Sequence, residues 1–103
     1  MAFRRPRFAE LVERQLDLFL ADNAELLREV GEALDAYDAA GRDEAEERYG
    51  AYVDLVDTAR EELEELRDAY RLTLEEDAGD EYATSFSSGV RTRLPHLALE
   101  LDD

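Results

Sequence analysis

The chain lacks cysteine, tryptophan and lysine, and it has only one histidine among its 103 residues. Without cysteine, disulfide bonds and thiolate metal ligands are excluded. With His96 as the only imidazole, zinc sites and carboxylate–histidine di-metal sites lack their ligands. The sequence also contains no glycine-rich phosphate loop and no set of residues for nucleophilic catalysis. We therefore expect a protein that is not an enzyme and that binds no cofactor.

Long apolar runs are missing as well. No stretch approaches the roughly 20 apolar residues that a membrane-spanning helix needs. The arginines near the N-terminus are not followed by the apolar core of a signal peptide. The expectation is a soluble, cytoplasmic protein that has no membrane partner.

Basic residues are few, because 12 arginines face 28 acidic residues and leave a net charge of −16. A field of this sign repels nucleic acid, so nucleic acid is not an expected partner. The simplest interpretation is a solvated acidic surface. The alternative is a surface that imitates nucleic acid and occupies a basic site on another protein.

What the sequence does contain is helical periodicity. In two segments, mostly apolar positions are spaced alternately four and three residues apart. The first series is Val12, Leu16, Phe19, Asn23, Leu26, Val30, Ala33 and Tyr37, and the second is Ala45, Tyr49, Tyr52, Val56, Ala59, Leu63, Leu66, Tyr70 and Thr73. This spacing is the 3.5-residue repeat of a coiled-coil seam. The two series are out of phase, because continuing the first would place Glu44 in the seam. The chain is therefore expected to break near Gly41 and to fold back on itself.

The residues around the break favour a turn. Gly41 suits the left-handed conformation that often follows a helix end, and Asp43 can cap the next helix. The predicted fold is all-α: a long antiparallel helical hairpin, coiled-coil-like, with a short C-terminal helix and an extended tail. Its parts are a basic N-terminal arm at 1–6, a hairpin at 7–79 with helix 7–40, turn 41–43 and helix 44–77, and a C-terminal docking segment at 80–103.

Folding about Gly41 pairs the positions whose numbers sum to 82. This register sets Phe19 opposite Leu63 and Leu16 opposite Leu66 in the antiparallel seam. Asn23 is the only strongly polar residue of the seam, and a polar seam residue typically fixes the register at some cost in stability.

A second apolar stripe follows the first helix beside the seam. A monomeric hairpin would expose it, which soluble monomers usually avoid. We therefore predict that the stripe is the contact face for a second copy, and that a dimer is favoured, as a two-fold four-helix bundle. The alternative is that the protein's own tail covers the stripe. The predicted oligomer interface consists of Leu20, Ala24, Leu27, Gly31, Leu34 and Val53.

The C-terminal segment differs in composition from the two arms. Tyr82, Phe86 and Val90 are spaced as on a short helix, whose end is weakened by two serines and Gly89. Further on, Leu97, Leu99 and Leu101 alternate with other residues, which suggests an extended piece. Either the segment folds back on the open end of the hairpin, or it is a recognition segment that binds a partner and is disordered alone. The predicted docking residues are Leu11, Leu18, Leu72, Tyr82, Phe86, Val90, Leu97 and Leu99.

Two functions from different classes fit this pattern. The first is a non-enzymatic structural or adaptor protein that mediates protein–protein interaction through self-association and its C-terminal segment, with an unidentified protein partner. The second is the acidic decoy that binds a basic partner in place of nucleic acid. Salt separates them, because binding by charge weakens as salt rises whereas burial of apolar surface persists.

Overall fold

The computed structural model describes residues 7–97, and these residues fold into helices only, which confirms the predicted all-α class. No strand occurs in this range. The N-terminal arm predicted at 1–6, together with Leu99 and Leu101, lies outside the described residues. In chain order, the elements are α1 (Ala9–Asp22), α2 (Ala24–Ala39), α3 (Ala45–Arg71), α4 (Glu76–Arg93) and the short 3₁₀ helix η1 (Pro95–Leu97).

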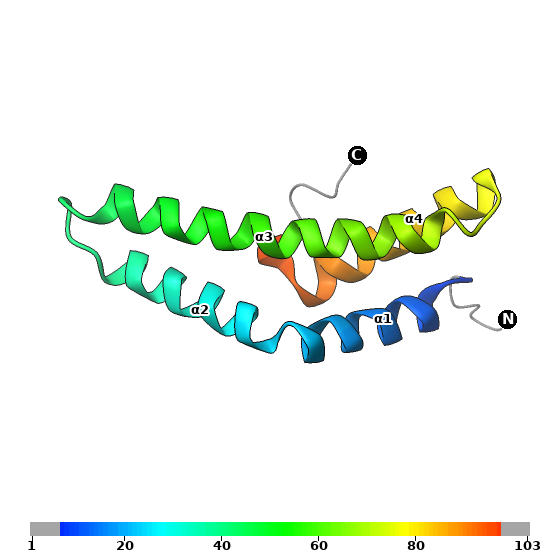
Figure 1. Cartoon of the computed structure of the whole chain (residues 1–103), viewed down its shortest axis with the longest axis horizontal. Helices are drawn as coiled ribbons and strands as arrows, with labels where there is room; N and C mark the ends of the chain where they lie inside the picture. Colours follow the sequence, from blue (N-terminus) through cyan, green and yellow to red (C-terminus); the bar gives the residue numbers. More distant parts are fainter. Residues whose placement is uncertain (1–6, 98–103) are drawn as a thin grey trace, which may run out of the picture.

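The chain reverses direction between α2 and α3, so that α2 lies alongside the first half of α3 (Figure 1). Ala40 ends α2 by adopting an extended conformation, with φ −72° and ψ 142°. The backbone N–H groups of Glu44 and Ala45 then donate to the Gly41 carbonyl oxygen, each at 3.0 Å. The left-handed conformation expected of Gly41 is wrong, because no glycine between residues 7 and 97 has a positive φ. The expected Asp43 cap is also wrong, since α3 begins after Glu44 without a side-chain cap.

The first arm is bent at Asn23, where the sequence predicted one helix from 7 to 40. Asn23 adopts φ −118° and ψ 26°, which ends α1 and separates it from α2. Its side-chain amide donates to the Phe19 carbonyl oxygen at 3.0 Å, and its backbone N–H donates to the same oxygen at 3.0 Å. The polar group is therefore satisfied within its own arm, where it competes with the regular helical bonding and bends the helix.

The bend makes room for α4, which packs against both α1 and α3 (Figure 1). Arg93 at the end of α4 reaches Asp17, with Nη2 2.7 Å from Oδ1, and Arg7 lies 3.8 Å from Glu81. These pairs show that α4 runs in the same direction as α1. Arg71 also pairs with Asp80, so α4 runs opposite to α3. The molecule therefore has a three-helix end, made of α1, α4 and residues 59–71 of α3, and a two-helix end, made of α2 and residues 45–58.

The second half of the chain differs from its predicted boundaries. The second arm ends at Arg71 rather than at residue 77, and Leu72 just beyond it is 86% exposed. The short helix predicted after residue 80 is an 18-residue helix that begins at Glu76. Acidic residues in its first turn and arginines in its last turn both favour the helix dipole. The extended piece predicted around Leu97 begins as the 3₁₀ helix η1.

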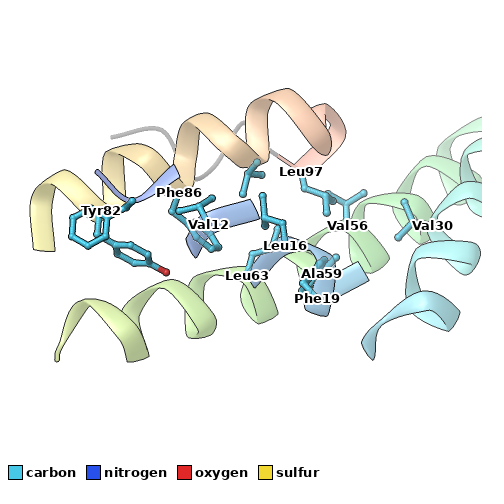
Figure 2. Close-up of a cluster of buried hydrophobic side chains, with 12 residues drawn as sticks. Val12, Leu16, Phe19, Val30, Val56, Ala59, Leu63, Tyr82, Phe86 and Leu97 are labelled. Carbon is cyan, nitrogen blue, oxygen red and sulfur yellow. The ribbon is translucent and has the colours of Figure 1, made fainter. Parts of the chain in front are cut away.

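The core is concentrated at the three-helix end (Figure 2). The largest fully buried side chains are Leu16, Leu63, Tyr82, Phe86 and Val90, three of which belong to α4. The Tyr82 ring contacts Phe8, Tyr70 and Phe86, with centroids 5.6, 4.8 and 5.9 Å apart, and its hydroxyl donates to Gln15 Oε1 at 2.7 Å.

Candidate interaction surface

The two-helix end has no third helix among the described residues, and its side chains are correspondingly less buried. In α2 only Val30 is buried, at 9% exposure, and in residues 45–58 only Val56 is buried. By contrast, three side chains of α1 and four residues of α4 are buried. Two helices alone cannot enclose a core, so the apolar side chains around Val30 and Val56 keep contact with solvent.

The predicted oligomer interface lies largely on this end. Leu20, Leu34 and Val53 are half-buried without packing on the core, while Leu27 packs against it. Ala24 and Gly31 are exposed, and a Cβ added to Gly31 would have no atom within 4 Å. The surface beside Gly31 is therefore open enough for another backbone to approach closely.

The stripe begins on α1 just beyond the residues that α4 covers. A Cβ added to Gly89 of α4 would lie 2.8 Å from Val12 Cγ1 and 3.1 Å from Leu16 Cδ1, so α4 covers this side of α1. Leu20 follows Leu16 by one helical turn, and Leu27 and Leu34 follow at intervals of seven. α4 stops before this stretch, where the Leu97 side chain of η1 is buried beside Val56 (Figure 2).

Three tyrosines gather near the turn of the two-helix end. The rings of Tyr37 and Tyr49 have centroids 5.3 Å apart, and those of Tyr49 and Tyr52 are 6.3 Å apart. Tyr37 is 36% exposed and Tyr49 is 51% exposed. Amphipathic, partly exposed tyrosines are typical of protein-binding surfaces. The sequence placed both tyrosines in the seam and therefore missed their exposure.

Charges are arranged differently at the two ends. At the two-helix end, Arg28 pairs with Glu25 and Glu32, and Arg48 pairs with Glu44, always within one helix. No ion pair holds Asp35, Asp38 or Glu46, which fall within the described residues. At the three-helix end, Arg67 pairs with Asp68 within α3, but Arg7, Arg71 and Arg93 each pair with a carboxylate of another segment and so tie α4 to its neighbours.

The predicted docking residues fall into three groups. The first group is Tyr82, Phe86, Val90 and Leu97 of the C-terminal segment, which are buried. Leu11 belongs with them, because it is half-buried against the same core. Leu18 is 60% exposed, and Leu72 is exposed as well, so α4 covers neither of them. Leu99 lies outside the described residues.

We also considered a ligand cavity, His96, metal binding and membrane insertion. A cavity of about 420 Å³ lies between the start of α1 and α4, lined by Arg7, Phe8, Glu81, Thr84, Ser85 and Ser88. His96 is exposed. Between residues 7 and 97, no group of three or more histidine, aspartate or glutamate side chains is placed to hold a metal ion. None of the helices described is long and apolar enough to cross a bilayer.

Comparison with protein-family models, with curated proteins and with solved structures finds no significant match to this chain.

Proposed function

We propose that this chain is a non-enzymatic adaptor, and that its two-helix end binds a helical segment of another polypeptide. The observation that carries the proposal is the apolar stripe of Leu20, Leu27, Leu34 and Val53, whose side chains are half-buried and over which no helix of the described residues lies. Covering such a stripe removes apolar surface from water, and each Å² buried stabilises the complex by about 25 cal/mol. The exposed tyrosines add contact area at the same end.

Self-association is the form of this binding that the sequence predicts. A second copy that sets its own stripe against the first would complete a four-helix bundle with two-fold symmetry. The small residues Ala24 and Gly31 favour close approach of the two helices. In this form the adaptor is a homodimer.

The test is sedimentation of two matched variants. Leu27→Asp places a carboxylate in the stripe, whereas Leu18→Asp places one on an exposed position of α1 at the other end. We expect Leu27→Asp to abolish or weaken association while the helical circular dichroism is kept, and Leu18→Asp to leave association unchanged. If the two variants associate equally well, with a partner or with themselves, the stripe is not the binding surface.

The C-terminal segment was the second binding element expected from the sequence. Its buried side chains Tyr82, Phe86 and Val90 support a scaffold role for α4, because binding a partner through them would require α4 to leave the core. We therefore place partner binding on the two-helix end.

The acidic decoy is the second candidate, and the net charge of −16 favours it. A decoy would engage a basic protein surface by charge alone. Its binding would fall steeply between about 0.05 and about 0.5 M salt and would be indifferent to Leu27→Asp. The adaptor instead requires the leucine at both salt concentrations.

A further inference from the structure

The way α4 is held at the three-helix end indicates what kind of segment could cover the apolar stripe at the two-helix end. Its apolar side chains Tyr82, Phe86 and Val90, spaced four residues apart, enter the core and are fully buried. Around this apolar line, three arginine–carboxylate pairs join α4 to its surroundings, at Arg7–Glu81, Arg71–Asp80 and Arg93–Asp17. The docked helix is thus held by an apolar line and by opposite charges on its flanks.

The two-helix end repeats only the apolar half of this arrangement. Asp35 follows Gly31 by four residues and Asp38 follows Leu34 by four, so both carboxylates lie along the continuing stripe. On α3, Glu46 precedes Val53 by seven residues and lies on the same side of the helix. By this spacing the three carboxylates border the stripe, and no arginine between residues 7 and 97 forms an ion pair with them.

The imbalance extends over the whole two-helix end. Residues 24–58 contain eleven aspartates and glutamates against three arginines, a net charge of −8. Two of the three arginines, Arg28 and Arg48, are already paired within their own helices. The two-helix end therefore has an apolar stripe that a partner could bury and an excess of negative charge that a partner could neutralise.

We propose that a basic amphipathic helix from another protein binds the apolar stripe, and that this helix is about as long as the 16-residue α2. It would set apolar side chains at i, i+4 and i+8 on the stripe and arginine or lysine side chains against Asp35, Asp38 and Glu46. This inference rests on the proposed function and names the chemistry of its partner. A second copy fits the charge poorly, because it brings another two-helix end with a net charge of −8 and the same three carboxylates beside its stripe, and like charges in an interface oppose association.

The probe is a synthetic helical peptide of the length of α4, 18 residues, with leucine at i, i+4 and i+8 and arginines on both flanks. One control peptide keeps the leucines and replaces every arginine by glutamate. The other keeps the arginines and replaces every leucine by serine. Binding to the full chain is measured by calorimetry at about 0.05 M and about 0.5 M salt.

We expect the arginine–leucine peptide to bind at least about tenfold more tightly than either control at low salt. Leu27→Asp should weaken its binding about tenfold or more, and Leu18→Asp should leave it unchanged. The double variant Asp35→Asn, Asp38→Asn should weaken binding roughly threefold to tenfold at low salt and less at high salt. Glu76→Gln with Asp77→Asn, an equal loss of charge on α4, should have no such effect.

Several results would overturn the proposal. Equal binding of the glutamate peptide would show that charge does not select the partner. If the chain forms a stable dimer at low salt and Leu27→Asp dissociates it, a second copy covers the stripe. The adaptor function would then stand, but the basic partner would not. Binding of the serine peptide as tight as that of the leucine peptide would indicate the decoy instead. Indifference to Leu27→Asp in every assay would remove the proposed function itself.

Discussion

The two ends of this molecule are built from the same two arms and yet differ in completeness. At the three-helix end, α4 closes the groove between α1 and α3 and supplies Tyr82, Phe86 and Val90 to the core. At the two-helix end, α2 and α3 pack only on each other, and Tyr37 and Tyr49 keep contact with solvent. The comparison teaches that a pair of helices of this composition buries few side chains without a third helix. Within residues 7–97, a third helix lies along only one end of the pair.

The largest expected difference between the ends concerns buried aromatic side chains. Phe86→Ala removes a fully buried ring from the three-helix core, and a cavity of this kind typically costs about 3–5 kcal/mol of unfolding free energy. Tyr49→Ala at the two-helix end removes a ring that is half exposed and should cost well under half of that. Urea unfolding of both variants measures the difference, and equal costs would contradict the contrast between the ends.

Alkaline pH should act on the three-helix end through Tyr82. Burial raises the pKa of Tyr82 from 10.0 to about 12. Above pH 10 the unfolded chain releases the phenol proton while the folded chain retains it, so the stability that is fully present below pH 10 is lost toward pH 12. The slope for one such group is about 1.4 kcal/mol per pH unit. Tyr82→Phe should lower this slope in urea unfolding between pH 10 and pH 12; an unchanged slope would show that Tyr82 is not the group concerned.

Two glycines provide the next comparison. A Cβ at Gly89 would lie 2.8 Å from Val12 Cγ1, so Gly89→Ala must displace packed side chains and should cost about 1–3 kcal/mol. Gly31 has open space and lies inside α2, so Gly31→Ala should stabilise the chain by about 0.5–1 kcal/mol through helix propensity. Thermal unfolding of the two variants should therefore shift in opposite directions. If both variants shift the unfolding temperature in the same direction, the predicted difference in packing around Gly89 and Gly31 is contradicted.

The sequence anticipated much of the core, because the alternating spacing depends only on which helix face is apolar. The seam positions that are buried in the structure include Val12, Leu16, Phe19, Val30, Val56, Ala59 and Leu63. The seam did not show where the burial would stop. Tyr37 and Tyr49 belong to the same spacing and are exposed, because burial there depends on a third helix that the described part of the chain does not place over them.

The bend and the third helix were the features that sequence reasoning missed. Asn23 was expected to hold the register across the arms, but its side chain bonds Phe19 in its own arm and bends the helix. From the sequence, Gly89 is expected to weaken the end of a short helix. In the structure, its missing side chain is what lets α4 approach Val12 and Leu16. The role of Gly89 depends on a tertiary contact that a local pattern does not encode, whereas the Asn23 side chain bonds locally instead of across the arms.

Native-state amide hydrogen exchange, with and without the arginine–leucine peptide, tests the central claim most directly. Without peptide, we expect α1, α4 and residues 59–71 to exchange most slowly, and α2 with residues 45–58 at least about tenfold faster, because fewer buried contacts hold the two-helix end. With peptide, α2 and residues 45–58 should slow while α4 remains unchanged. Uniform protection along all four helices, or peptide protection confined to α4, would contradict the division into a complete end and an open one.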